Sequence, residues 1–458
     1  MAPTLDWLLP RLAAHGHQRA LISGSEAIRY SDLVASVLGW NDELDSLGVL
    51  PGESIAIVGN YSPNVVGLLI AAIERGAIVV PLTNRSYSLF PRSLDVACVT
   101  RVIEVTPTSY DSYVREDANP EHEMLKDLRQ NGEAGLILFT SGSTGERKAP
   151  LLSFNRLLER FQTPRSAHRT LVFLMFDHIG GLNTLFHTLC NGGTVVTVDE
   201  PSVGAVCTAI AEHDIELLPT TPSFLNMLLL SGEHQKHDLS SLKLVTYGTE
   251  PMPFSSLRAL AAEFPDVKFK QTYGLSELGI MQTKSRDSDS LWMKVGGDGI
   301  ETRIVDGILH IRTASAMRGY LNAPSPFDSE GWFNTQDEVD VDGEFIRVKG
   351  RTSEIINVAG EKVYPAEVES VLMEVPNVQN ALVYAKKNAV VGSVVAAKIS
   401  PREPEPDEVL IRRVKEYCRE RLAPYQIPVL ILVTDEIVVS DRFKKSRLGA
   451  GVAASANV

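Results

Sequence analysis

The sequence predicts an α/β protein with a large N-terminal domain of βαβ-type sheets, a β-rich subdomain, and a small α+β C-terminal domain. Three observations lead to this prediction. Short apolar strands alternate with helical patterns through the first part of the chain, short β segments prevail from about residue 301, and a compact mixed section follows Arg351. A chain of 458 residues is also too long for one compact core, so two or three domains are expected.

The N-terminal alternation is clearest over residues 54–82. SIAIVG (54–59) is typical of a strand, NVVGLLIAAIERG (64–76) is amphipathic with a helical period, and AIVVPL (77–82) is a second strand. Repetition of this pattern indicates largely parallel sheets covered by helices, in which ligands bind beyond the carboxyl ends of the strands. Further segments of the same kind are strands at 170–175, 193–198 and 242–248 and a helix at 203–213.

The C-terminal part of the chain changes from this alternation to shorter β segments. ETRIVDGILHIRT (301–313) and EFIRVKGR (344–351) read as strands, and a domain boundary is expected near 350–353. The remaining stretch of about 105 residues is near the usual size of an independent domain. Within it we expect a helix at 366–375, strands at 381–387 and 394–400, a proline-rich break at 401–406, and a charged helix at 407–422.

The overall charge excludes some classes of partner. Lysine plus arginine (44) against aspartate plus glutamate (57) gives a net charge of −13. Nucleic-acid and anionic-membrane binding depend on a basic surface, so neither is expected. Anionic small molecules stay possible ligands, because a cleft can carry its own local positive charge.

Cysteine usage and the N-terminus indicate a cytoplasmic location. The four cysteines lie far apart in the sequence, which is typical of buried thiols in a reducing compartment rather than of disulfides or a metal site; they are Cys98, Cys190, Cys207 and Cys418. The N-terminal segment MAPTLDWLLPRLAAHG has no basic start and contains a proline in its apolar run, so a signal peptide is not expected. No window reaches the ~20 apolar residues of a membrane span.

The segment LILFTSGSTGERK (136–148) is the strongest candidate for an anion site. An apolar strand is followed by small hydroxyl and glycine residues and then by Lys148, which together can surround an anion with amides, hydroxyls and a cation. The spacing is not that of a Walker loop, because Lys148 comes three residues after Gly145 rather than directly after it. A flexible surface turn is the alternative, since serine, threonine and glycine are common in loops.

Five further segments follow this loop, and the ordered series resembles the adenylate-forming superfamily. The superfamily includes acyl-CoA and aryl-CoA synthetases, peptide-synthetase adenylation domains and luciferases. The segments are YGTEP (247–251), QTYGLSELG (271–279), GWFNTQDEVDVDGEF (331–345), VKGRTSEIINVAGEKVYPAEVE (348–369) and DRFKKSRL (441–448). The resemblance therefore covers nearly the whole chain.

The sequence departs from the family pattern at single positions. Arg147 stands where proline is common in the loop, Ser276 where threonine is common, and Gln336 where glycine is common. Phe443 replaces a glycine near the C-terminus, and Ser353 stands at the hinge position usually held by aspartate or lysine. The serine at the hinge puts the efficiency of the second half-reaction in question.

The resemblance implies a nucleotide site and assigns roles within it. Tyr273 would face the adenine, Ser276 would contact the α-phosphate, Asp337 would bind the ribose hydroxyls, and segment 248–251 would lie against the purine. As alternatives, Ser276 and Glu277 could begin a helix, and Asp337 could be a solvated turn acid. The full set is Thr140, Ser141, Gly142, Ser143, Thr144, Gly145, Lys148, Gly248, Thr249, Glu250, Pro251, Tyr273, Gly274, Ser276, Asp337 and Arg351.

The resemblance also implies the catalytic groups. Lys444 aligns with the lysine that grips the carboxylate and the α-phosphate, and Lys445 is a neighbouring cation that could take its place. A lysine ammonium suits this role because it is a compact point charge. Glu277 would bind Mg²⁺ together with phosphate oxygens. His178 aligns with a gate residue between the nucleotide and the acyl pocket.

The acyl pocket is expected beside FDHIGGLNTLFHTL (176–189). Amino-acid-activating domains place an aspartate just after the gate position, and Ile179 at that place disfavours an amino acid as substrate. Asp177, one residue before His178, keeps this alternative open, although it could equally cap a helix. The mixed walls favour an aryl or medium-length acid. The pocket residues are His178, Ile179, Thr246, Tyr247, Gly274 and Ile280.

The small domain is expected to be mobile. The resemblance implies domains at 1–350 and 354–458 with a hinge at 351–353, in which Ser353 is the pivot. After the first half-reaction the small domain would rotate, and Gly360 would then line a tunnel for a pantetheine arm, where a glycine permits close backbone approach.

The leading hypothesis is an ATP-dependent acid–thiol ligase. It would use ATP and Mg²⁺, form an acyl-AMP from a carboxylic acid, and transfer the acyl group to CoA or to the pantetheine of a carrier protein. Three alternatives stay open: an adenylating enzyme with an oxyanion or amine as second partner, a degenerate member that binds nucleotide without turnover, and a phosphate-hydrolysing P-loop enzyme. The sequence does not determine the acid or the oligomeric state.

Overall fold

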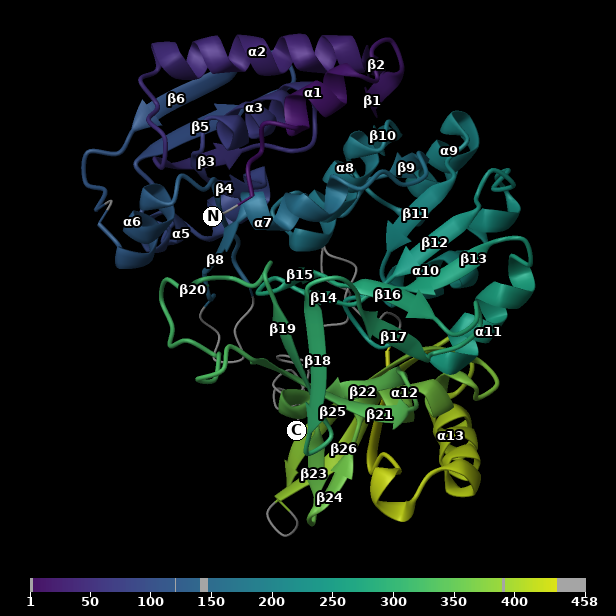
Figure 1. Ribbon diagram of the computed structural model, residues 1–458. Helices are drawn as coiled ribbons and strands as arrows, with labels where there is room; N and C mark the ends of the chain where they lie inside the picture. The colour runs from purple at the N-terminus through teal and green to yellow at the C-terminus, as the bar shows by residue number, and fades with distance from the viewer. Residues whose placement is uncertain (1–2, 120, 141–146, 389–391, 435–458) are drawn as a thin grey trace.

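The computed structural model describes residues 3–119, 121–140, 147–388 and 392–434. Two seven-stranded sheets make up the N-terminal part, a six-stranded sheet lies below them, and a small C-terminal unit with a three-stranded sheet lies at the bottom of the view (Figure 1). The predicted fold class, α/β with a β-rich subdomain and a small α+β domain, is confirmed.

The first seven-stranded sheet is parallel at its centre and antiparallel at its edges. Strands β7, β4, β3 and β5 are parallel, whereas β6 at one end and β8 and β20 at the other are antiparallel. In order across the sheet the strands are β20 (Gly319–Tyr320), β8 (Pro150–Ser153), β7 (Gly135–Ile137), β4 (Ile78–Leu82), β3 (Ser54–Val58), β5 (Arg101–Val105) and β6 (Tyr110–Val114).

The second seven-stranded sheet is parallel except for its last strand, β2. In order its strands are β13 (Lys268–Gln271), β12 (Leu244–Tyr247), β11 (Leu217–Thr220), β9 (Arg169–Leu171), β10 (Thr194–Thr197), β1 (Arg19–Ser23) and β2 (Glu26–Arg29). Strand β9 is shorter than the predicted strand at 170–175. The chain leaves the sheet after Leu171 because residues 174 and 175 lie against the first turn of the next helix, where a Cβ on Gly181 would be 2.1 Å from the Met175 carbonyl oxygen.

The helices begin where the sequence offers good caps. Ser62, Ser202 and Thr221 each accept a hydrogen bond from a backbone N–H in the first turn of α3, α9 and α10. The N-terminal helices are α1 (Leu8–Ala13), α2 (Tyr30–Ser46), α3 (Pro63–Glu74), α4 (Asn84–Leu89), α5 (Ser93–Val96), α6 (Glu123–Gln130), α7 (Phe154–Leu158), α8 (Ile179–Cys190), α9 (Val203–His213), α10 (Pro222–Ser231) and α11 (Phe254–Glu263).

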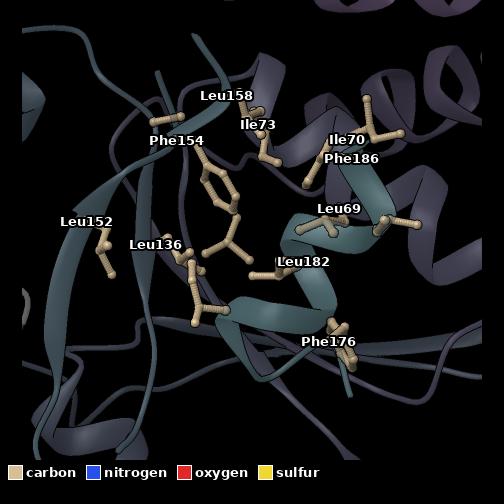
Figure 2. Close-up of a cluster of buried hydrophobic side chains, with 14 of the residues drawn as sticks. Leu69, Ile70, Ile73, Leu136, Leu152, Phe154, Leu158, Phe176, Leu182 and Phe186 are labelled. Carbon is tan, nitrogen blue, oxygen red and sulfur yellow. The ribbon is translucent and has the colours of Figure 1, made fainter. Parts of the chain in front are cut away.

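The largest core cluster joins both seven-stranded sheets. It contains residues of β3, β4 and β7 from the first sheet, β1 and β10 from the second, and α2, α3 and α8. Figure 2 shows part of this cluster, where Leu69, Ile70 and Ile73 of α3 and Leu182 and Phe186 of α8 gather around the side chain of Phe154. Helix α8 is therefore held by apolar contacts on the side that faces α3.

The remaining strands form the β-rich subdomain and two short hairpins. The six-stranded sheet has the order β16 (Gln282–Ser285), β17 (Met293–Gly296), β22 (Phe345–Arg351), β21 (Phe333–Asp342), β19 (Ile308–Thr313) and β18 (Ile300–Val305). The short hairpins are β14 (Gly274–Leu275) with β15 (Gly279–Ile280), and β23 (Ile356–Val358) with β24 (Glu361–Val363).

The small C-terminal unit has its own core. Its elements are α12 (Pro365–Met373), β25 (Val378–Asn388), β26 (Gly392–Pro401), α13 (Asp407–Arg421) and β27 (Leu430–Val433). The first four lie close to the predicted segments, whereas β27 is not among the predicted strands. Lys362 and Tyr364 from this unit donate hydrogen bonds to Glu338 on β21, which ties it to the six-stranded sheet. A boundary at 351–353 stays a prediction.

The buried hydroxyl of Tyr30 connects α2 to α8 and β10, and its removal tests that connection. Tyr30 is fully buried and donates to the carbonyl oxygens of Gly193 at 2.7 Å and Leu189 at 3.0 Å. Tyr30→Phe is expected to lower the free energy of unfolding by about 1–3 kcal/mol, because a buried acceptor loses its donor. Urea denaturation measures the change. Tyr113→Phe, at an exposed hydroxyl pair with Tyr87, is the control and should change stability little.

Candidate active site

A buried carboxylate lies at the centre of the candidate site. Strands β21 and β22 pair so that Asp337 stands opposite Arg351. Asp337 is 5% exposed, its Oδ1 lies 3.3 Å from Nε of Arg351, and its Oδ2 accepts a short hydrogen bond from the hydroxyl of Tyr273. Burial raises the pKa of Asp337, while Arg351 and Tyr273 act in the opposite direction. The solvated turn acid considered from the sequence is therefore wrong for Asp337.

The residue before Asp337 has an unusual backbone conformation. Gln336 has φ 61°, in the left-handed region, where the family pattern has glycine. Its backbone N–H donates to Asn334 Oδ1 at 2.8 Å, and the N–H of Asp337 donates to Thr335 Oγ1 at 3.1 Å. Glycine would adopt this left-handed turn without strain. With glutamine at residue 336, the hydrogen bonds to the side chains of Asn334 and Thr335 hold the turn instead.

Glu277 lies in a tight hairpin rather than at a helix start. The turn at 276–278 joins β14 to β15, so the alternative of a helix start with a capping serine is wrong. A Cβ on Gly274 would be 2.8 Å from the carbonyl oxygen of Gly279, so the strands approach closely because residue 274 is glycine. Oε1 of Glu277 accepts a hydrogen bond from Tyr320 at 2.7 Å.

Tyr320 connects Glu277 to the lysine that follows the serine-rich loop. Nζ of Lys148 lies 5.0 Å from the centre of the Tyr320 ring, a cation–π contact. Burial and the neighbouring Glu277 raise the pKa of Tyr320, which keeps its hydroxyl protonated as a donor. Sequence reasoning missed Tyr320, since it lies 43 residues from Glu277 and no short motif contains both.

The ends of the serine-rich loop are held together. Thr140 and Lys148 form an antiparallel bridge, with N–H to carbonyl distances of 3.0 and 3.2 Å. The residues on either side of the loop therefore lie next to each other. The predicted phosphate contacts Ser141, Gly142, Ser143, Thr144 and Gly145 lie outside the described residues.

The segment that follows β12 packs against Thr272, the residue before Tyr273. A Cβ on Gly248 would be 2.6 Å from the carbonyl oxygen of Thr272, so this close approach requires glycine. Thr249 is exposed with φ 76°, an outlier for a β-branched residue. Oε1 of Glu250 accepts from the N–H of Ser223 at the start of α10, and Pro251 follows.

These groups fall into two connected sets. One contains Tyr273, Asp337 and Arg351, and the other contains Lys148, Tyr320 and Glu277. Arg351 lies close enough to Tyr320 to oppose the rise in the pKa of its hydroxyl, and Glu277 lies close enough to Arg351 to help raise the pKa of the guanidinium, which places the two sets beside each other. Predicted residues from four separate segments therefore converge in space.

The predicted acyl-pocket residues are only partly brought together. Ile179 and Ile280 line a common cavity of about 30 Å³ beside α8, while the other four are not part of its lining. Ring Nδ1 of His178 accepts from the N–H of Gly180 at 3.2 Å, so His178 caps α8 and the capping role considered for Asp177 is wrong. Tyr247 packs in the core cluster on the α10 and α11 side of its sheet.

The hinge and tunnel residues follow directly after β22. Ser353 is exposed in a 3₁₀ turn, Thr352–Glu354. Gly360 has φ 97° in the turn between β23 and β24, and its N–H donates to Asn357 Oδ1 at 2.8 Å. Lys444 and Lys445 lie outside the described residues.

The donor set is compatible with Mg²⁺ held through a nucleotide. Among the residues described here, no group of three or more His, Cys, Asp or Glu side chains could hold a metal ion alone. Mg²⁺ is commonly bound by one carboxylate together with substrate phosphates and water, and Glu277 keeps one carboxylate oxygen without a hydrogen bond to any of the described residues. None of the described helices is both long enough and apolar enough to cross a membrane.

Comparisons with known proteins agree with this geometry. Residues 90–321 match the family model described as AMP-binding enzyme, and residues 367–447 match the model described as AMP-binding enzyme C-terminal domain. The chain is 28% identical to an indoleacetate–CoA ligase of Aromatoleum aromaticum, over 94% of both chains. It is 26% identical to a feruloyl-CoA synthase of an Amycolatopsis species, over 94% of this chain and 95% of the relative.

A solved structure has the same fold. The crystal structure of the anthranilate CoA ligase AuaEII in complex with anthranoyl-AMP superposes with a TM-score of 0.80, at 20% identity and over 98% of both chains. At this level of identity the likeness concerns the fold.

The pairing of Asp337 with Arg351 makes stability depend on pH in a defined direction. In Arg351→Met the folded-state pKa of Asp337 rises further, while its unfolded-state pKa does not change. The ionised carboxylate therefore destabilises the folded state of the variant more than that of the wild type. We expect a loss of about 1–3 kcal/mol at pH 8, shrinking as the pH falls below the raised folded-state pKa of Asp337, where the buried carboxyl is protonated in both the wild type and the variant. Urea denaturation across this range measures it. Arg351→Lys is the control, and a deficit independent of pH would contradict the assignment.

The backbone strain at Thr249 can be tested by substitution. Thr249→Gly is expected to raise the free energy of unfolding by about 1 kcal/mol. Glycine removes the left-handed backbone strain of a β-branched residue in the folded state, and this gain exceeds the cost of the larger conformational entropy that glycine gives the unfolded chain. Thr246→Gly, within the ordinary strand β12, should instead lower stability. Thermal denaturation of the pair distinguishes the two effects, and an equal loss in both variants would refute the strain at residue 249.

Proposed function

The chain belongs to the AMP-binding enzyme family, and from this premise we propose that it is an ATP-dependent, AMP-forming acid–thiol ligase. The observation that carries the proposal is the convergence of Lys148, Tyr320 and Glu277 with Tyr273, Asp337 and Arg351. A carboxylate and a triphosphate are both anions, and these residues supply cations and donors at the place where they would meet.

In the first half-reaction an oxygen of the substrate carboxylate attacks the α-phosphorus of ATP. A new P–O bond forms, the bond to the β-phosphate oxygen breaks, and pyrophosphate leaves with its electron pair. Lys148 and the serine-rich loop would hold the β- and γ-phosphates, and Asp337 would accept hydrogen bonds from the ribose hydroxyls. When bound at Glu277, Mg²⁺ would neutralise charge on the phosphate oxygens.

In the second half-reaction a thiol attacks the acyl carbon of the acyl-AMP. The thioester forms, AMP leaves, and the thiol proton passes to solvent. We propose that the small domain, residues 354–458, turns about Ser353 between the two steps. Arg351 is the last residue of β22 and touches the ribose-binding Asp337, so this rotation would begin directly beside the nucleotide.

The proposed acid is an aryl or medium-length acyl acid. The relatives named indoleacetate–CoA ligase and feruloyl-CoA synthase take their names from aryl acids. Ile179 at the start of α8 and Ile280 on β15 offer apolar contacts to such a group. CoA is the proposed acceptor, with carrier-protein pantetheine as the other thiol to be tested, and the cytosol is the proposed location.

The first half-reaction can be tested by ATP–pyrophosphate exchange with a panel of acids. The wild type should exchange label with aryl or medium-length acids, and Lys444→Ala should lose about 10²–10³ of that rate because a charge at the point of attack is removed. Lys445→Ala is the matched control and should keep most of the activity. If neither substitution slows exchange, the assigned catalytic lysine is wrong.

The second half-reaction needs its own readout. AMP release and thioester formation are measured with CoA, and then with a carrier protein bearing pantetheine. Thioester with either acceptor supports the ligase, whereas acyl-AMP that accumulates with both would favour a non-thiol partner. AMP binding without exchange for any acid would indicate a degenerate member.

A further inference from the structure

Several basic side chains gather beside α8. Arg160 follows α7, His187 is on α8, and Lys270 is on β13; Arg165 lies near all three and is exposed. Burial lowers the pKa of Arg160 to about 10 and that of His187 to about 4, with Arg165 adding to both effects. The pKa of Lys270 is also lowered, first by burial and then by Arg165 and Arg160. At neutral pH His187 is therefore uncharged.

This basic cluster, Arg160, Arg165, His187 and Lys270, has no acidic partner within the described part of the chain. None of its members forms an ion pair there, although most arginines of the β-rich subdomain do. The guanidinium of Arg160 donates to the carbonyl oxygen of Ile280, which satisfies a donor without neutralising the charge. Gathering partly buried like charges costs free energy unless an anion compensates them.

The cluster reaches the cavity that Ile179 and Ile280 share through one member, Arg160. Arg160 lines that cavity, and Asn183, another lining residue, is four residues before His187 on α8, so both are on one helix face. Most of the remaining wall is apolar and includes Leu136, Phe154, Leu158, Leu182 and Phe186, whose side chains are drawn in Figure 2. A largely apolar cavity with a cation in its wall and further cations nearby suits a ligand with an apolar body and an anionic group.

Strand register places Lys270 on the same side of the sheet. Lys270 pairs directly with Thr246, a predicted wall of the acyl pocket. Their neighbours Val245 and Phe269 pack in the core cluster on the opposite face, so Thr246 and Lys270 both face away from that core. Lys270 is three residues before Tyr273, about 10 Å along an extended chain, which puts it away from the reacting phosphate.

From this arrangement we propose that the basic cluster binds a second, distal anionic group of the acid substrate, so that the preferred substrate is a dicarboxylic acid with an apolar middle section. One carboxylate is activated at the nucleotide and the other lies between Arg160 and Lys270. The cavity of about 30 Å³ is enough for a small polar group but not for a whole aryl acid, as expected for the far end of a longer pocket. This proposal rests on the proposed ligase function.

Matched acids test it in the full-length enzyme. ATP–pyrophosphate exchange is measured with octanedioate against octanoate, and with 3-(2-carboxyphenyl)propanoate against 3-phenylpropanoate. The wild type should prefer the diacid of at least one pair by about 10-fold or more in kcat/KM, because a hydrogen-bonded charge pair forms in a partly dry site. A preference for the monoacid in both pairs would overturn the proposal, whereas no exchange with any acid would count against the ligase function itself.

Variants localise the effect. Lys270→Gln should reduce the diacid-to-monoacid ratio about 10–100-fold, and Lys268→Gln, on the exposed part of the same strand, should leave the ratio unchanged. An unchanged ratio in Lys270→Gln would refute the assignment. Lys270→Met repeats the test should the glutamine variant fold poorly.

A binding measurement distinguishes a diacid substrate from a free inorganic anion as the ligand of the basic cluster. Octanedioate should raise the melting temperature of the wild type but not of Lys270→Gln, and inorganic phosphate should raise neither. If phosphate stabilises the wild type and not the variant, and no diacid is preferred, the cluster binds a free anion and the substrate assignment is wrong.

Discussion

The register between β21 and β22 is the constraint on which the site depends. It places Arg351 opposite Asp337 and so makes a buried carboxylate tolerable next to the Tyr273 hydroxyl. A buried charge without such partners would be neutralised or would destabilise the fold. The register shifts between Glu338 and Val339, so the pairing of Asp337 with Arg351 belongs to the short part of the ladder at the end of β22, directly before the proposed start of the small domain.

The same pairing connects binding to motion. Arg351 is both the last residue of β22 and the partner of Asp337, and the exposed turn that holds Ser353 follows directly. On the other side of the turn, Lys362 and Tyr364 bond to Glu338, the residue after Asp337. Contacts from both sides of the proposed hinge therefore meet on two adjacent residues of β21, and a rotation of the small domain would have to break one set while it keeps the other.

The anion-binding features of this protein are local, and they lie within a chain whose net charge is negative. The chain has a net charge of −13, yet Lys148 and Arg351 lie beside the proposed nucleotide site and Arg160 and Lys270 beside α8. In the two proposals these two groups of cations have separate partners: Lys148 and Arg351 serve the nucleotide, and the basic cluster serves the distal carboxylate of the acid.

The sequence by itself determined the fold class, several of the strands and helices, and the superfamily, because periodicity and short motifs are local properties of the chain. It also placed Glu277, Asp337 and Arg351 among the candidates. Only the tertiary structure decided that Ser276 and Glu277 are in a hairpin, that His178 caps α8, that Tyr247 faces a core, and that Tyr320 and Lys270 lie where they do. These facts depend on contacts between residues far apart in sequence, for which no spacing along the chain carries a signal.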